Sequence, residues 1–138
     1  MGGGRLSSYL LDTHVWAWGI KFDQQLPRRI AELIQNADSI QVSAISLYEI
    51  TQKVKLGKWS EMEPHANNLV QILSDQGGNL ISVDAEVAQV AGMLEWQHRD
   101  PFDRLLAATS IVKRIPIMTA DIAFDQLQGR KGWPGRIW

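Results

Sequence analysis

Residues 39–56 read Ser-Ile-Gln-Val-Ser-Ala-Ile-Ser-Leu-Tyr-Glu-Ile-Thr-Gln-Lys-Val-Lys-Leu, and the spacing of their apolar side chains changes part-way. Apolar and polar residues alternate over residues 39–43, which is typical of a strand. From Ser46 to Leu56 the apolar residues recur at helical spacing, and Gly57 follows where a helix-ending glycine is expected. A strand followed at once by a helix is the repeating unit of a parallel α/β fold.

This alternation of strands and helices extends in both directions along the chain. Tyr9-Leu10-Leu11 is a short apolar run that ends at Asp12, and such runs are typical of strands buried on both faces. Asp100 followed by Pro101 indicates a helix start, because Asp caps a helix and Pro fits its first position. We therefore predict a single α/β domain whose mainly parallel sheet has four to five strands flanked by helices. The predicted strands are residues 9–11, 39–43, 80–83, 115–118 and 136–138, and the predicted helices are residues 28–36, 46–56, 64–76, 84–96 and 101–112, with a short one ending near residue 127.

The size of the chain predicts one compact domain. Its 138 residues are 45% hydrophobic, which is enough for a single core and too apolar for a disordered chain. We expect residues 8–138 to form the domain. Residues 1–7, which include Gly2-Gly3-Gly4, are expected to be a flexible leader.

The composition excludes several classes of protein. The chain has no cysteine, so disulfides and thiolate metal sites are excluded. No apolar run approaches the ~20 residues that a membrane helix needs, and the N-terminus lacks the apolar segment of a signal peptide. We therefore expect a cytoplasmic protein with no membrane association. The net charge of −1 argues against a simple nucleic-acid-binding module but allows a nuclease, whose acidic site offsets its basic residues.

Four acidic residues fall where a parallel α/β sheet binds its ligands. Asp12 and Asp121 each end a predicted strand. Glu49 and Asp103 each lie in the first turn of a predicted helix that begins near the same edge. Ligands of such sheets bind beyond the carboxyl ends of the strands, so we expect the four side chains to lie near one rim.

Each acid also has a purely structural explanation when it is taken alone. Glu49 would close a capping box with Ser46 and pair with Lys53 one turn later. Asp100, before Pro101, is best explained as a helix cap and stays outside the set. The other three would lie at a cap or in a first helical turn, where the helix dipole favours an acid: Asp12, Asp103 and Asp121.

The acids taken together indicate a divalent cation. Carboxylates that lie close together raise one another's pKa, and a hard cation such as Mg²⁺ or Mn²⁺ relieves that repulsion. Such cations suit phosphate chemistry. Other metal chemistry has little support, because the three histidines lack zinc-like spacing: His14, His65 and His98.

Four stretches match the motifs of one known family in order and spacing. They are residues 9–18 (Tyr-Leu-Leu-Asp-Thr-His-Val-Trp-Ala-Trp), 42–50 (Val-Ser-Ala-Ile-Ser-Leu-Tyr-Glu-Ile), 98–108 (His-Arg-Asp-Pro-Phe-Asp-Arg-Leu-Leu-Ala-Ala) and 117–121 (Ile-Met-Thr-Ala-Asp). On these stretches, which span nearly the whole chain, the protein resembles PIN-domain proteins of the VapC toxin type.

The resemblance implies a Rossmann-like sheet and a Mg²⁺- or Mn²⁺-dependent endoribonuclease that hydrolyses RNA phosphodiester bonds, acting as the toxin of a toxin–antitoxin pair. Thr119 matches the family's hydroxyl residue before the last acid, and Asp100 matches a frequent extra acid. The residues that match the family's metal-binding and catalytic acids are Asp12, Glu49, Asp103 and Asp121.

The resemblance also implies partners. Such toxins typically form homodimers and are inhibited by a cognate antitoxin, whose C-terminal segment covers the site. Trp16 and Trp18 follow Asp12 closely, so we expect them to line the antitoxin-binding groove. Their replacement by alanine is then expected to weaken inhibitor binding while sparing the fold.

Two other functional classes remain open from the sequence. A haloacid-dehalogenase-type phosphatase would need Asp-x-Asp after the first strand, and Asp12-Thr13-His14 lacks the second acid. A phosphoaspartate receiver would need an acidic pair before its phosphorylated Asp and a lysine after a late strand, and neither pattern is clear. A catalytically silent PIN-fold domain that binds protein or RNA would not need the complete acidic set. In the ribonuclease hypothesis, phosphate contacts would come from basic side chains, for which the candidates are Lys53, Arg99 and Arg104.

Overall fold

The computed structural model describes residues 7–138. The expected leader therefore lies outside the described residues, except for Ser7. The Ser7 backbone N–H donates to Asp38 Oδ2 at 2.6 Å, and the Asp38 N–H donates to the Ser7 hydroxyl. The first described residue is thus tied to the start of the second strand, and the division into leader and domain stays a prediction.

The described chain forms one five-stranded sheet in which every neighbouring pair of strands is parallel. The strand order is β3-β2-β1-β4-β5, so the chain builds outward from β1 in one direction and then in the other. This confirms the predicted α/β class and parallel sheet. The strands are β1 (Ser8–Leu11), β2 (Ser39–Ser43), β3 (Asn79–Ile81), β4 (Ile117–Met118) and β5 (Arg136–Ile137).

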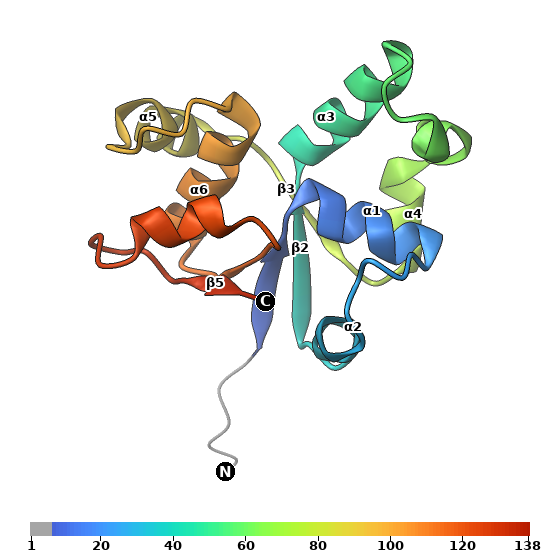
Figure 1. Cartoon of the computed structure of the whole chain (residues 1–138), viewed down its shortest axis with the longest axis horizontal. Helices are drawn as coiled ribbons and strands as arrows, with labels where there is room; N and C mark the ends of the chain where they lie inside the picture. The colour runs from blue at the N-terminus through green and yellow to red at the C-terminus, as the bar shows by residue number, and fades with distance from the viewer. Residues whose placement is uncertain (1–6) are drawn as a thin grey trace.

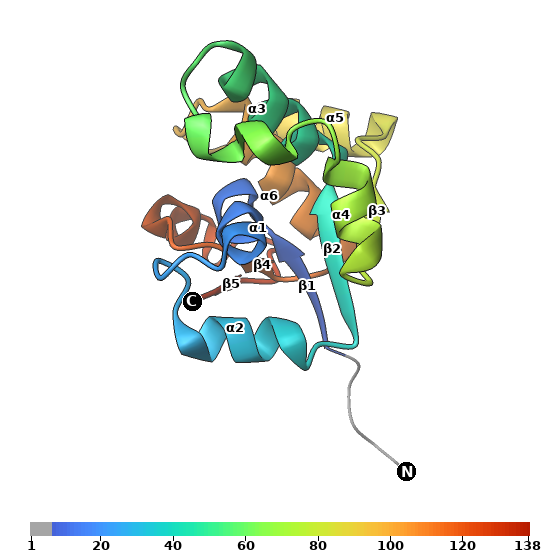
Figure 2. The same cartoon turned by 90° about the vertical axis from the view of Figure 1, so that its right-hand side faces the viewer.

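Helices cover both faces of the sheet. Leu10 and Leu11 point to opposite faces because side chains alternate along a strand, and both are buried. Leu11 packs with α1, α2 and α4, whereas Leu10 packs with α6 and η2. Figures 1 and 2 show these two layers, with α3 above the carboxyl ends of β1 and β2. The helices are α1 (Thr13–Lys21), α2 (Arg28–Gln35), α3 (Ala44–Lys55), α4 (Leu69–Asp75), α5 (Ala85–Met93) and α6 (Pro101–Lys113), with short helices η1 (Ser60–His65) and η2 (Ile122–Leu127).

Two predicted helix caps are confirmed. Asp84 accepts the N–H of Val87 at the start of α5. Asp100 accepts the N–H groups of Phe102 and Asp103 at the start of α6. None of the helices within residues 7–138 combines the length and the apolar character needed to cross a membrane.

The predicted start of α3 is wrong. The helix begins at Ala44, and its cap is Ser43, whose hydroxyl accepts the N–H of Ile45 at 3.1 Å. Ser46 therefore lies inside the helix, and its hydroxyl bonds to that of Thr13 on α1 at 2.8 Å. The expected capping box between Ser46 and Glu49 does not form, and Glu49 lies beyond the first turn. The strand runs straight into the helix, so the last strand residue takes the cap.

Two other predicted helices differ in length. The single helix predicted over residues 64–76 is η1 followed by α4, with a break at residues 66–68. The helix predicted to reach residue 96 ends at Met93, because Leu94 takes an extended conformation. The chain after Leu94 then folds back over α6, which brings residues 96–98 toward the carboxyl edge of the sheet.

Candidate metal centre

Asp12 lies where the strand order reverses, directly after the central strand β1. Its Oδ1 accepts the N–H of Val15 at 2.9 Å, so it caps α1. Its Oδ2 accepts the Thr119 hydroxyl at 2.5 Å. Thr119 follows β4 and is fully buried, and its oxygen accepts the N–H of Asp121 at 3.1 Å. One hydroxyl therefore connects the first and the last of the predicted acids.

All four predicted acids line one cleft of about 440 Å³ at this edge of the sheet. Asp121 reaches it from the loop after β4, where it also caps η2. Asp103 reaches it from the first turn of α6, as predicted. Basic and aromatic side chains complete the wall of the cleft, among them Lys53, His98, His14 and Trp18.

Glu49 differs from the other acids in how its charge is balanced. It is 6% exposed, and its Oε2 lies 2.6 Å from Lys53 Nζ one helical turn later. The predicted ion pair is thus confirmed. The Lys53 ammonium also lies over the ring of Trp59, 5.5 Å from its centre, which is a cation–π arrangement. The protein itself supplies the counter-charge of Glu49.

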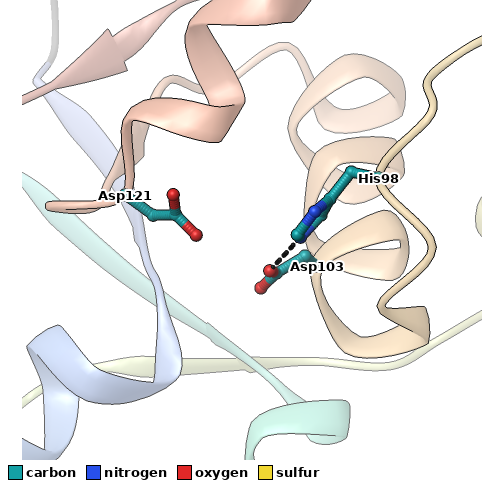
Figure 3. Close-up of side chains that lie close together, drawn as sticks. All are labelled: His98, Asp103 and Asp121. Carbon is teal, nitrogen blue, oxygen red and sulfur yellow. Dashed lines mark hydrogen bonds and ion pairs between the residues drawn. The ribbon is translucent and has the colours of Figure 1, made fainter.

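A tighter cluster lies inside the cleft. Ligand atoms of His98, Asp103 and Asp121 all lie within 4.8 Å of one another. Figure 3 shows the Asp121 carboxylate pointing across the cleft toward the other two side chains, which come from α6 and the loop before it. Asp12 and Glu49 line the same cleft but are not part of this cluster of described residues.

His98 is the site residue that sequence reasoning missed. Its Nε2 lies 2.7 Å from Asp103 Oδ2, although the sequence shows only three scattered histidines. His98 and Asp103 are five residues apart, which is not a helical spacing. Their side chains come close only because the chain turns at Asp100 before α6 begins. The signal available in the sequence was that a histidine stands two residues before the helix start at Asp100-Pro101.

Arg104 and Trp16 have other roles than those expected. The Arg104 guanidinium donates to backbone carbonyls of α5 and of the segment between α5 and α6, so its donors are already engaged within the fold. Trp16 is 2% exposed, and its Nε1–H donates to Gln76. Its replacement by alanine would therefore not spare the fold, which corrects that expectation. Trp18 does line the cleft.

Comparison with known proteins places the chain in a family. The sequence model of the family described as PIN domain matches residues 9–130. The chain belongs to the PIN domain family. This PIN domain is 28% identical to Ribonuclease VapC22 of Mycobacterium tuberculosis over 117 residues, which covers 84% of the chain and 88% of that protein.

Solved structures confirm that this PIN domain has the predicted fold. VapBC2 from Rickettsia felis, bound to a promoter DNA fragment, contains a chain with a TM-score of 0.67 at 21% identity, covering 95% of this chain and 98% of that one. VapBC-5 from Mycobacterium tuberculosis, of the VapBC family of toxin-antitoxin systems, gives 0.66 at 17% identity, covering 95% and 99%.

Negative charge in the cleft of this PIN domain is poorly compensated. Burial raises the pKa of Asp103 to about 6, and the charges of Asp100 and Asp12 add to this, although the contact with His98 opposes it. Burial also raises the pKa of Asp12, against the hydrogen bonds from Thr119 and Val15. A cation in the cleft would favour the ionised form of both carboxyls.

The pKa of Asp103 leads to a pH-dependent prediction. Protons compete with cations for a carboxylate, so Mn²⁺ affinity is expected to fall about tenfold from pH 7 to pH 5 for a pKa of about 6. In the metal-free protein, stability changes in the opposite direction: the raised pKa of Asp103 makes the free energy of unfolding fall as the pH rises. The raised pKa makes the folded state hold a proton that the unfolded state loses, so this contribution is full below about pH 4 and is lost as the pH rises through about 6.

Both parts of this prediction can be measured on the same protein. Isothermal calorimetry with MnCl₂ at pH 5 and pH 7 gives the affinity, and urea unfolding in EDTA over the same range gives the stability. The same Mn²⁺ affinity at both pH values would contradict the prediction.

Proposed function

We propose that this protein is a Mg²⁺- or Mn²⁺-dependent endoribonuclease that acts as the toxin of a toxin–antitoxin pair. The observation that carries the proposal is the convergence of Asp12, Asp103 and Asp121 in one cleft of a PIN domain. The similarity to a protein named as a ribonuclease supports RNA as the substrate. The same observation favours an enzyme over a silent binding domain, which has no need for poorly compensated acids.

The side chains of the cleft fit a divalent cation. Asp103 and Asp121 offer oxygen ligands within 4.8 Å of each other, and Asp12 lies beside them in the cleft. The raised pKa values of Asp12 and Asp103, where burial disfavours the charged form, support a role for an external positive charge. When bound, the cation would make water more acidic and offset charge on the phosphoryl oxygens.

The remaining residues of the cleft position these acids and the substrate. Thr119 fixes the orientation of Asp12 through its hydroxyl and holds the loop of Asp121 through that residue's N–H. We assign Glu49, whose charge Lys53 already balances, the role of orienting a water molecule rather than binding the cation. Lys53 lines the cleft and can contact a phosphate. Arg99 is exposed beside His98 and remains a candidate for the same contact.

Metal removal provides the direct test of this function. The purified chain is expected to cleave structured RNA in about millimolar MnCl₂ or MgCl₂. Excess EDTA is expected to abolish cleavage, and added Mn²⁺ to restore it. Cleavage that persists in EDTA after dialysis would refute the metal mechanism, and a failure to cleave any RNA with either cation would refute the ribonuclease proposal.

We also propose that a second part of the antitoxin, besides the segment expected to cover the acidic site, occupies another cavity of the protein. A cavity of about 580 Å³ lies between α1, α2, β2 and the end of α4, and the described residues that line it are separate from those of the cleft. Its wall is mainly apolar, and the Phe22 ring at its rim is 93% exposed. VapBC-5, a structural neighbour, belongs to a toxin–antitoxin family, which supports this kind of partner.

A variant of the cavity tests the antitoxin proposal separately from catalysis. Ala31→Arg on α2 places a charged side chain at the wall of the cavity and is expected to weaken antitoxin inhibition at least about tenfold, since a charge must then be buried. RNA cleavage by the free variant is expected to stay unchanged. Ala88→Arg, on the exposed side of α5, is the control. Equal inhibition of both variants would reject the cavity as the binding surface.

The homodimer and the cytoplasmic location expected from the sequence stay predictions. Sedimentation of the purified chain tests the first, because a single species of 15.5 kDa would exclude a dimer. The phosphatase or receiver alternative gains no support from the cleft, where the side chains that gather are those of a PIN domain.

A further inference from the structure

We propose that His98 is a direct ligand of the cation and makes the centre bind Mn²⁺ in preference to Mg²⁺. The inference rests on the proposed function, because it concerns the cation of that same cleft. The residues that match the family's metal site are all acids, so a nitrogen ligand from His98 would be an addition to that set.

The first support is the position of the imidazole ring. His98 Nε2 belongs to the cluster in which all ligand atoms lie within 4.8 Å of one another, with Asp103 and Asp121 as the other members. Figure 3 shows the ring edge facing the space between the two carboxylates. Ligand atoms around one first-row cation lie about 3 to 4 Å apart, because each lies about 2.1 Å from the ion. A cation between these three side chains would therefore require only small movements.

The second support is that the backbone holding His98 is fixed. Arg104 donates from one nitrogen to the carbonyl of His98 at 3.0 Å and to that of Trp96 at 2.8 Å. The Trp96 ring lies against the imidazole, with 4.8 Å between ring centres, and its Nε1–H donates to Gln126 at 2.9 Å. A surface histidine that merely pairs with an acid needs no such support. Ligands of metal centres are commonly held by neighbouring groups in this way.

The third support is the chemistry of the donor. Mg²⁺ takes oxygen ligands and keeps several of its waters, whereas imidazole is a usual ligand of first-row transition metals. Of the two cations that suit the acids, Mn²⁺ is the transition metal. In the structure, Nε2 lies 2.7 Å from Asp103 Oδ2, on the side of the ring that faces the cleft. In the tautomer that carries its proton on Nδ1, the Nε2 lone pair of His98 would be available to hold the cation.

The test uses His98→Gln in the whole 138-residue chain, with His14→Gln as the control. Glutamine can still hydrogen-bond to Asp103, so the variant removes the ring nitrogen and keeps the positioning contact. His14 is exposed and lines the same cleft, but it lies outside the cluster. Mn²⁺ and Mg²⁺ affinities are measured by calorimetry, and nitrogen coupling to bound Mn²⁺ is measured by pulsed electron paramagnetic resonance.

We expect nitrogen coupling in the wild-type protein and in His14→Gln, and its loss in His98→Gln. The Mn²⁺ affinity of His98→Gln is expected to fall about 10- to 100-fold, while its Mg²⁺ affinity changes less than about threefold, because Mg²⁺ gains little from a nitrogen ligand. Mn²⁺ binding without nitrogen coupling in the wild-type protein would overturn the inference, and so would an equal loss of both affinities.

These outcomes separate the inference from the proposed function. RNA cleavage that depends on a cation, combined with Mn²⁺ binding that shows no nitrogen coupling, would leave the ribonuclease intact and reject only the role of His98. A wild-type protein that binds neither cation would reject both.

Discussion

In a metal-dependent assay, Asp12→Asn is expected to lower RNA cleavage about a thousandfold, which corresponds to a loss of ~4 kcal/mol of transition-state stabilisation. The carboxylate is 8% exposed and faces the cleft between β1 and β4. The fold is expected to survive, because Asn caps a helix as well as Asp does and can still accept the N–H of Val15. The neutral amide also removes the burial of a charge that raises the pKa of Asp12. The metal-free variant is therefore expected to be at least as stable as the wild type.

Asp84→Asn is the matched control for this prediction. Asp84 caps α5 through the N–H of Val87 in the way that Asp12 caps α1, but its carboxylate lies away from the cleft and pairs with Lys113. Initial rates of cleavage and urea unfolding curves are measured for both variants. A variant Asp12→Asn that cleaves at more than a tenth of the wild-type rate would remove this residue from the catalytic set. Unfolding of Asp12→Asn alone would point instead to a structural role for its charge.

Arg104→Met is expected to destabilise the protein by about 3 kcal/mol, because hydrogen bonds from a charged donor contribute roughly 1.5 to 3 kcal/mol each and are not additive. The guanidinium holds the turn between α5 and α6 through the carbonyls of Ala91, Leu94, Trp96 and His98. Methionine keeps much of the apolar stem but leaves these carbonyls without their donor. The melting temperature is expected to fall by about 10 °C for a domain of this size.

The same variant is expected to weaken Mn²⁺ binding, because the carbonyl of His98 loses its donor. Arg28→Met is the control, since Arg28 is 93% exposed in its side chain and pairs only with Glu32, and such pairs contribute about 0 to 1 kcal/mol. Differential scanning calorimetry and Mn²⁺ titration at a temperature where both variants are folded separate the two effects. A melting temperature for Arg104→Met equal to that of Arg28→Met would show that the turn does not depend on this residue.

The sequence was most informative where one element ends and the next begins. The residues at those junctions have local chemical reasons for their positions: Asp84 and Asp100 cap helices, and Asp12 follows an apolar strand. Because β1 and β4 bury consecutive side chains on both faces, their apolar runs favoured a parallel sheet, and the topology then brought the acids to one edge. These parts of the fold and the site depend on short-range patterns.

What could not be predicted depends on contacts between distant segments. The pattern Ser46-x-x-Glu49 fits a capping box, but the length of β2 decided the cap in favour of Ser43. Nothing local in the sequence shows that Arg104 draws the chain of residues 94–98 back over α6. That return is what brings His98 to Asp103, so the histidine could not be distinguished from the two others in the chain.

The order in which the strands enter the sheet has a consequence for the time at which the protein becomes active. Asp12 and Thr119 are hydrogen-bonded across 107 positions of the chain, and β1 has β4 as one of its two neighbours. A ribosome delivers β1, β2 and α3 long before it delivers β4 and the loop of Asp121. The nascent chain therefore carries half a cleft for most of its synthesis. RNA cleavage by the nascent chain is therefore not expected before the residues of β4 and the loop of Asp121 have been added.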